Sequence, residues 1–147
     1  MPRFARLFEA AADTLNAYYQ AVADNSIDAV MSLWIDEEFA TCICADGTHL
    51  HGLESIRAGL GKQFETQPLN IEPLDIRVYD SLGTVVYAIA EAHQNAVALA
   101  PRMIFTTYVM VHERGEWRIA HIHASEMPTD AAGQFAAKLR HGQGPLH

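Results

Sequence analysis

One acidic side chain interrupts a long apolar stretch of the sequence. Glu91 lies within residues 85–94, which are otherwise almost entirely apolar. If this stretch is a strand, alternation places Glu91 on the same face as Tyr87, Ile89 and His93. Burial destabilises the charged form of a carboxyl group, and a neighbouring imidazole could receive or return its proton. This pattern indicates proton abstraction beside a carbonyl group, or a dehydration, although a structural pairing of Glu91 with an arginine stays open.

Two His-x-His pairs have a spacing that could bind a metal ion. His121 and His123 form one pair, and His49 and His51, followed by Glu54, form the other. A zinc or iron site needs at least one further ligand at about 2 Å from the ion. No such ligand is placed by the sequence, so we expect no metal site. The histidines are expected to form hydrogen bonds within a sheet or at a dimer contact.

Other catalytic patterns are missing from the sequence. No glycine-rich phosphate loop is present, and Ser125 near His123 has no acidic partner, which argues against a hydrolase triad. We therefore expect no cofactor. The two cysteines, Cys42 and Cys44, are two residues apart and are expected to be reduced thiols of the core.

The composition limits the possible partners. The 147 residues carry 18 acidic and 10 basic side chains, a net charge of −8, so binding to nucleic acid is not expected. Half of the residues are hydrophobic, which favours a globular domain with a subunit contact. The longest uninterrupted apolar run, residues 85–90, is far shorter than the roughly 20 residues of a membrane span. No targeting segment is recognised, so we expect a cytoplasmic protein without membrane contact.

Helices are expected first in the chain and strands after them. Apolar residues recur at helical spacing over residues 4–22, 27–34 and 53–64. Short strands are expected at 39–44 and 48–51, and longer ones at 74–79, 85–94, 103–113 and 117–126. This order predicts a single α+β domain, residues 1–147, with an antiparallel sheet, a core at about 4–128 and a C-terminal tail at 129–147. The tail is expected to contain a short helix and a loose end.

The last hairpin allows a prediction of its register. A two-residue turn at Arg114-Gly115 would place an arginine at positive φ, so we expect a three-residue loop with only Gly115 left-handed. Tyr108 would then lie opposite Ala120. One face would carry Thr106, Tyr108, Met110, Arg118, Ala120, Ile122 and Ala124, with space around its alanines. The other face would carry Phe105, Thr107, Val109, Trp117, Ile119, His121, His123 and Ser125, and would be filled.

Three segments resemble a known superfamily. LNAYYQAVADNSIDAVMSLW at 15–34, DGTHLHGLESIR at 46–57 and GEWRIAHIHAS at 115–125 are similar to the nuclear transport factor 2-like superfamily. The resemblance is to its SnoaL-like domains and to the association domain of calcium/calmodulin-dependent protein kinase II. It covers about residues 4–128. It implies a cone in which helices cover the concave face of a curved sheet, with a pocket between them and dimerisation through the outer face.

The superfamily does not determine the reaction, because it contains isomerases, dehydratases, cyclases, hydrolases and members that only bind or assemble. In the association domains, arginines on the two central strands line the pocket. The corresponding positions here carry Glu91, Tyr108 and Ala124, so the ligand class does not transfer.

The resulting functional hypothesis is a homodimer that holds a small, mostly apolar molecule in the cone. Glu91 would act as general base or acid, Tyr108 as hydrogen-bond donor and His93 as proton partner. The expected ligand contacts are Tyr87, Ile89, Thr106, Met110, Arg118, Tyr19 and Trp34; Tyr18 and Phe64 are further aromatic candidates for the wall. The alternative is a non-catalytic oligomerisation or ligand-binding module like the kinase association domain. A buried Glu91 paired with Arg118 or Arg102 would fit that alternative.

Overall fold

A computed structural model describes residues 2–95 and 100–142, with side chains described for 10–95 and 100–137. Three helices precede the long strands and one follows them, as the hydrophobic spacing predicts. The helices are α1 (Pro2–Ala23), α2 (Ile27–Met31), α3 (Gly52–Thr66) and α4 (Thr129–Gly142). The α2 helix begins at Ser26, whose side-chain oxygen accepts a hydrogen bond from the Ala29 amide at 3.2 Å.

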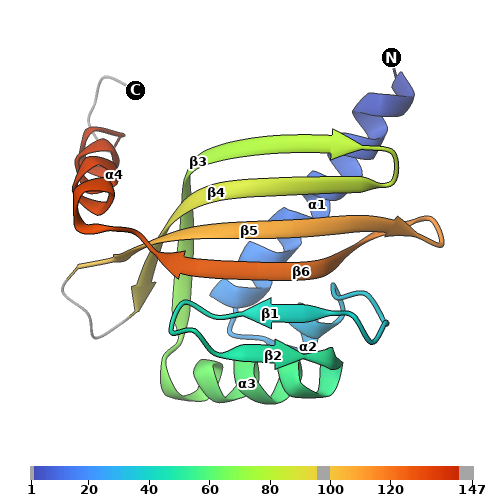
Figure 1. Ribbon diagram of the computed structural model, residues 1–147, viewed down its shortest axis with the longest axis horizontal. Coiled ribbons are helices and arrows are strands. Elements are labelled where there is room, and N and C mark those ends of the chain that lie inside the picture. The colour runs from blue at the N-terminus through green and yellow to red at the C-terminus, as the bar shows by residue number, and fades with distance from the viewer. Residues whose placement is uncertain (1, 96–99, 143–147) are drawn as a thin grey trace.

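The strands form one open sheet in the order β2-β1-β6-β5-β4-β3 (Figure 1). They are β1 (Thr41–Ile43), β2 (His49–His51), β3 (Leu69–Ser81), β4 (Thr84–Asn95), β5 (Arg102–Glu113) and β6 (Glu116–Glu126). The expectation of a purely antiparallel sheet is wrong in one place, because β1 pairs with β6 in parallel. The parallel pair arises because the chain passes through β2, α3 and the β3–β5 meander before β6 returns beside β1.

The sheet is strongly curved, and α1 lies behind it in the view of Figure 1. The main core fills the space between α1 and the inner face of the sheet, with α2 and α3 closing one side. The register of β3 and β4 shifts between Pro73 and Asp75. Such a bulge bends a strand and tolerates a proline, which has no amide hydrogen to donate. The fold is therefore the expected α+β cone, with a mixed sheet.

The tight turn between β5 and β6 differs from the prediction. His112 pairs with Trp117 and Glu113 with Glu116, which leaves Arg114 and Gly115 as a two-residue turn. Their φ angles are 52° and 82°. Two consecutive left-handed residues give the turn a twist that matches the twist of paired strands. The expected three-residue loop is therefore wrong, and Arg114 adopts the strained left-handed conformation.

This turn also changes which side chains of β6 face inward. A register shift next to Met110 places Met110 opposite Ile119 and Tyr108 opposite Ile122, instead of opposite Ala120. Trp117 and Ile119 consequently lie in the main core with Tyr108 and Met110, whereas the prediction placed them on the other face, with Phe105 and His121. Between the shift and the other end of the two strands, residues share faces as predicted: Thr106 pairs with Ala124, and Phe105 pairs with Ser125. The preference of large apolar side chains for the core thus outweighs the local strain of the turn.

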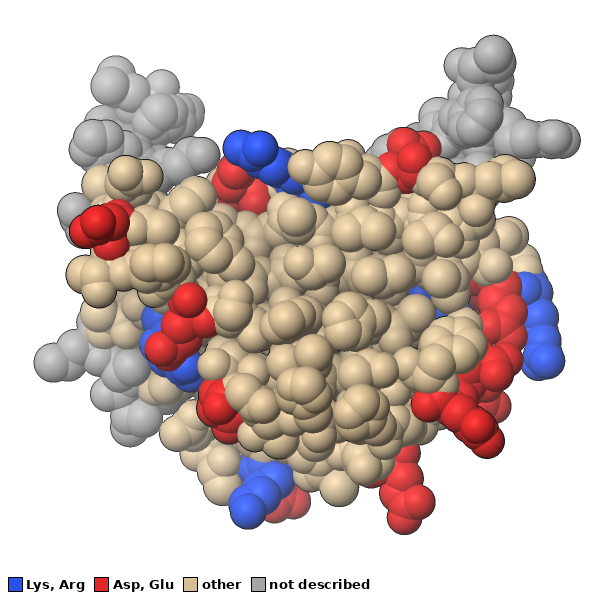
Figure 2. Space-filling view, viewed as in Figure 1, with Lys and Arg blue, Asp and Glu red and all other residues tan. Residues whose placement is uncertain are grey.

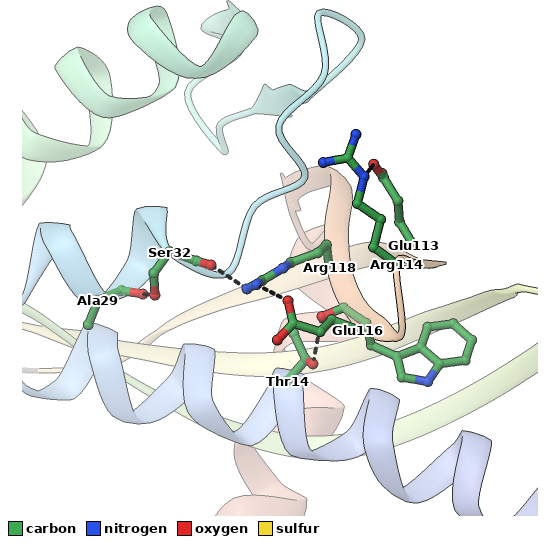
Figure 3. Close-up of polar contacts among 8 residues, drawn as sticks. Thr14, Ala29, Ser32, Glu113, Arg114, Glu116 and Arg118 are labelled. Carbon is green, nitrogen blue, oxygen red and sulfur yellow. Dashed lines mark hydrogen bonds and ion pairs between the residues drawn. The ribbon is translucent and has the colours of Figure 1, made fainter.

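Arg118 joins this hairpin to the helical layer (Figure 3). Its guanidinium donates to the carbonyl oxygen of Ser32, just after α2, at 2.5 Å and also contacts the Glu116 carboxylate. Nearby, the Thr14 hydroxyl on α1 donates to the Trp117 carbonyl oxygen at 3.0 Å. These bonds fix the start of β6 against two helices. Arg118 does not contact Glu91, whose partners lie elsewhere, and it is not among the described residues that line the cavity.

The C-terminal helix packs on the opposite side of the sheet from α1. Ala131, Ala132, Phe135 and Ala136 of α4 contact a small cluster of buried residues, Ala90, Ala92, Met103 and Met127. The expected loose end at 143–147 lies outside the described residues. Within the described ranges, no helix is long and apolar enough to cross a membrane.

Candidate active site

The carboxyl group of Glu91 lies at the centre of a polar cluster inside the cone. Its side chain has 0% exposure. Oxygen Oε2 accepts hydrogen bonds from the hydroxyls of Tyr19 at 2.7 Å and Tyr108 at 2.5 Å. Oxygen Oε1 contacts the Thr106 hydroxyl at 2.8 Å and Nε2 of His93 at 2.7 Å. These contacts use the roughly four acceptor positions of a carboxylate, so the group is buried but satisfied.

Local geometry explains how four distant positions meet at one carboxylate. In the register of β4 and β5, Glu91 pairs with Ile104, so Thr106 is its diagonal neighbour on the same face. Tyr108 lies two residues further along that face of β5, and its longer side chain reaches the carboxylate. His93 follows Glu91 by two residues and shares its face of β4. Tyr19 comes from the turn of α1 that crosses this part of the sheet. Alternation places Glu91 and His93 on one face of β4, and Thr106 and Tyr108 on one face of β5. The register of the two strands brings these faces together, and the Tyr19 contact requires the packed helix.

His93 is only partly buried and is the basic member of this cluster. Its side chain is 13% exposed, and it lines the cavity described below. With Nε2 bonded to Glu91, Nδ1 has no hydrogen-bond partner among the described residues. In the tautomer that donates from Nε2 to the carboxylate, Nδ1 carries a lone pair that could take a proton.

Three tyrosine rings pack edge to face around this carboxylate. Tyr18 and Tyr108 have ring centroids 5.5 Å apart, and Tyr19 lies 6.1 Å from Tyr108. Burial, and then the charge of Glu91, raises the pKa of Tyr19 and Tyr108, so both phenols stay protonated and donate. Tyr18 differs from the other two. It is 8% exposed and its hydroxyl has no hydrogen-bond partner in the part of the chain that the structure describes.

A cavity of about 520 Å³ extends from this cluster toward α3. That volume falls within the range of small-molecule sites. Apolar side chains from helices and strands form much of its wall: Val22, Ile43, Leu50, Leu60, Phe64, Leu69, Ile71 and Ile122. Polar and charged lining residues are Asp46, Thr48, Lys62, Gln63, Thr66, Gln67, Asn95 and Arg102. The cavity therefore combines an apolar interior with polar groups, and Glu91, His93, Thr106 and Tyr108 border it.

The wall also includes two residues that sequence reasoning assigned only to the core. Cys42 and Cys44 are free thiols, and both line the cavity. Their spacing on one strand predicts a shared face, but no sequence signal indicates that this face borders a cavity. Tyr18 was likewise considered only as an aromatic wall residue, since helical spacing does not reveal that its hydroxyl has no partner.

Several expected ligand contacts lie elsewhere. Tyr87, Ile89, Met110 and Trp34 belong to the main core and are not among the described residues that line the cavity. The register explains this placement, because Tyr87, Ile89 and Met110 lie on the inner face beneath α1. The Tyr87 hydroxyl and the Trp34 indole nitrogen are buried without a hydrogen-bond partner in residues 2–95 and 100–142.

The histidine pairs lie on the outer side of the sheet. His121 pairs with Thr41 and His123 with Ile43, and β2 adds His51 and His49 beyond them. The ring centroids of His121 and His123 are 6.1 Å apart. Within the described residues, no group of three or more His, Cys, Asp or Glu side chains could hold a metal ion. Burial, followed by the charge of His123, lowers the pKa of His121.

Comparisons with solved structures identify the fold. A protein from Thiobacillus denitrificans, described as an association domain of calcium/calmodulin-dependent protein kinase type II, is 24% identical with a TM-score of 0.69, covering 78% of this chain and 93% of that chain. A proposed dehydratase of the NTF2-like family from Streptomyces avermitilis is 17% identical with a TM-score of 0.76, covering 82% and 96%. A ketosteroid isomerase-like protein from Erwinia carotovora atroseptica is 16% identical with a TM-score of 0.67, covering 82% and 95%.

Because all three proteins are less than 25% identical to this chain, the similarity shows a shared fold and nothing more. No curated protein matches the sequence. The model of the SnoaL-like domain family, however, matches residues 11–130, most of the chain. This match agrees with the resemblance found in the sequence, so the chain belongs to the SnoaL-like domain family within the nuclear transport factor 2-like superfamily.

Proposed function

We propose that this protein binds a small, mostly apolar carbonyl compound in the cavity and catalyses a proton transfer on it, as an isomerase, dehydratase or cyclase would. One observation carries the proposal: a fully buried carboxylate, Glu91, holds the imidazole of His93 at 2.7 Å on the cavity wall. A base is most useful where it can reach the substrate and where the charge that it gains is compensated.

The roles differ from those expected from the sequence. The oxygens of Glu91 already accept four hydrogen bonds, so His93 is the group that meets the ligand. His93 takes a proton at Nδ1, and Glu91 orients the ring and compensates the positive charge that develops on it. Tyr108 and Thr106 hold the carboxylate in place, so Tyr108 acts through Glu91 and does not touch the ligand.

Tyr18 supplies the hydrogen-bond donor for the ligand oxygen. Its hydroxyl has no partner among the described residues, and burial raises its pKa well above the ordinary value, so the group stays a neutral donor. A carbonyl oxygen bound there would gain stabilisation as negative charge develops on it. The names of two similar structures, a dehydratase and a ketosteroid isomerase-like protein, are consistent with chemistry of this kind.

Hydrogen–deuterium exchange tests this proposal without knowledge of the product. Acetophenone, cyclohexanone and 2-tetralone would be incubated with the protein in D2O, and the loss of protons beside the carbonyl followed by NMR. We expect exchange that depends on the protein. His93→Gln should lower its rate about 10²–10⁴-fold, the usual contribution of a general base, and Glu91→Gln should lower it as well.

His112→Gln is the matched control, because His112 is exposed at the far end of β5 and should leave the rate unchanged. Exchange that survives in the His93→Gln variant, or a wild-type protein that accelerates exchange of none of the three ketones, would contradict the proposal.

We also propose that the outer face of the sheet pairs with a second copy of the chain. Figure 2 shows that the centre of this face carries few charged side chains. Phe105 is 40% exposed there, and Thr107 and Val109 beside it are half-buried. Light scattering should report a dimer, and Val109→Arg should convert it to a monomer. A larger ring would favour the alternative, an assembly module like the kinase association domain.

A further inference from the structure

Two sulfur atoms share one side of the cavity wall. Cys42 lies in β1 and Cys44 directly follows that strand. Because side chains alternate along a strand, the two residues point to the same side, and both line the cavity. Cys42 is 4% exposed and Cys44 is half-buried, and both are free thiols. The sequence has no other cysteine.

The two thiols interact with each other. The neighbouring Cys42 thiol lowers the pKa of Cys44, although burial acts in the opposite direction. Its interaction with Cys44, together with burial, raises the pKa of Cys42. The placement of the two sulfurs on one side of the cavity wall is what supports the proposal that follows.

The surroundings favour a bound group at this position. In the register, Cys42 lies between Leu50 of β2 and Ile122 of β6, both of which line the cavity. The unpartnered hydroxyl of Tyr18 lies close enough to both cysteines for their charges to raise its pKa. Tyr18 lines the same cavity, so a group bound beside the thiols would lie near a hydroxyl that has no other partner among the described residues.

A disulfide fits this pair poorly. Residues two apart on a strand have Cα atoms roughly 6.6 Å apart, close to the upper limit of about 6.8 Å for a disulfide, and their Cβ atoms point in parallel. An ion bound between the sulfurs tolerates the wider separation, because each metal–sulfur bond adds about 2.3 Å. The geometry therefore suits a bridging ion better than a covalent bond between the sulfurs.

We propose that Cys42 and Cys44 form a two-sulfur site in the cavity wall for a soft, thiophilic ion. Thiolates select soft ions such as monovalent copper over hard cations. No further His, Cys, Asp or Glu completes a group of three in the described residues, so the site suits an ion that accepts two ligands, as copper(I) does, and not a zinc ion that requires four. Trivalent arsenic shares this chemistry.

Charge also favours a cation at this position. The chain carries a net charge of −8, and Glu91 and Asp46 border the same cavity as the thiols. Of the two basic residues on the wall, Arg102 is paired with Glu126. Binding involves no oxidation or reduction: each sulfur binds the ion as a thiolate, and the protons of the two thiols pass to solvent.

Copper(I) titration of the full-length protein, under anaerobic conditions against the chelator bicinchoninate, tests the site. We expect one copper(I) ion per chain. Cys42→Ser and Cys44→Ser should each weaken binding about 10²-fold or more, since each removes one of two linked contacts. The double variant has no thiol, so it should not compete with the chelator. His121→Gln is the matched control for adventitious binding by a surface imidazole and should bind as the wild type does.

Phenylarsine oxide provides the second arm, because it condenses with two thiols and releases one water. Capture of this probe by the wild type, but by neither single variant, supports the two-sulfur site. If the protein captures the arsenic probe but does not bind copper(I), the site is specific for trivalent ions. Three outcomes would overturn the proposal: copper bound as tightly by the double variant, a single variant with wild-type affinity, or binding of neither probe. Thermal melting of each serine variant separates loss of the site from loss of the fold.

Discussion

Replacement of Glu91 measures how far the buried cluster supports the fold. Glu91→Ala removes the acceptor of four hydrogen bonds. His93 and Tyr19 are partly accessible and can find other partners, whereas the hydroxyls of Thr106 and Tyr108 are buried. Each buried donor left unsatisfied costs about 1–3 kcal/mol. The expected loss in the free energy of unfolding is therefore about 2–6 kcal/mol for the two donors.

Glu91→Gln should cost much less, although it also removes the negative charge. The amide keeps one oxygen acceptor and adds a donor group of the same shape. Hydroxyls can accept as well as donate, so Thr106 or the two tyrosines can reverse their roles around the amide. We expect a loss of about 1–2 kcal/mol, close to the value of one or two ordinary hydrogen bonds.

Urea unfolding at neutral pH, followed by circular dichroism, measures both losses. Glu72→Ala is the matched control, because this acidic side chain is exposed on β3; its effect should stay within about 0.5 kcal/mol. The reasoning fails if the alanine and glutamine variants of Glu91 lose the same stability. It also fails if Glu91→Ala is as stable as the wild type. That result would mean that the buried hydroxyls do not need this carboxylate as their acceptor.

Three further predictions concern the sheet. Arg114→Asn should raise the free energy of unfolding by about 0.5–1 kcal/mol, because asparagine tolerates the left-handed conformation better; urea unfolding that shows a loss would contradict the turn. Arg118→Leu should lower stability by about 1.5–3 kcal/mol through loss of the charged donor to the Ser32 carbonyl, and an unchanged midpoint would refute that role. Because the folded-state pKa of His121 is lowered, its contribution to stability is present above the ordinary value of 6.5 and is lost as the pH falls through the folded pKa. The drop in Tm between pH 8 and pH 5 should thus be smaller in His121→Gln, and an equal drop would contradict this.

The sequence determines the elements and their order because hydrophobic periodicity is local. Spacing of three and four residues identifies the helices, and alternation identifies the strands. The same alternation places Glu91 and His93 on one face without any knowledge of the fold. The sequence also carries enough similarity to indicate the superfamily, which the family match confirms.

Tertiary packing decided the features in which burial of apolar side chains competes with local backbone preference. Arg114 adopts a left-handed conformation because this turn, with the following register shift, allows Trp117 and Ile119 to enter the core, and burial of such side chains gains more free energy than the turn loses. Packing likewise brings Tyr19 to Glu91 and leaves Tyr18 without a partner, although the two are adjacent on one helix. Which hydroxyl is used and which is free depends on the angle at which that helix crosses the sheet, and no local pattern of residues encodes that angle.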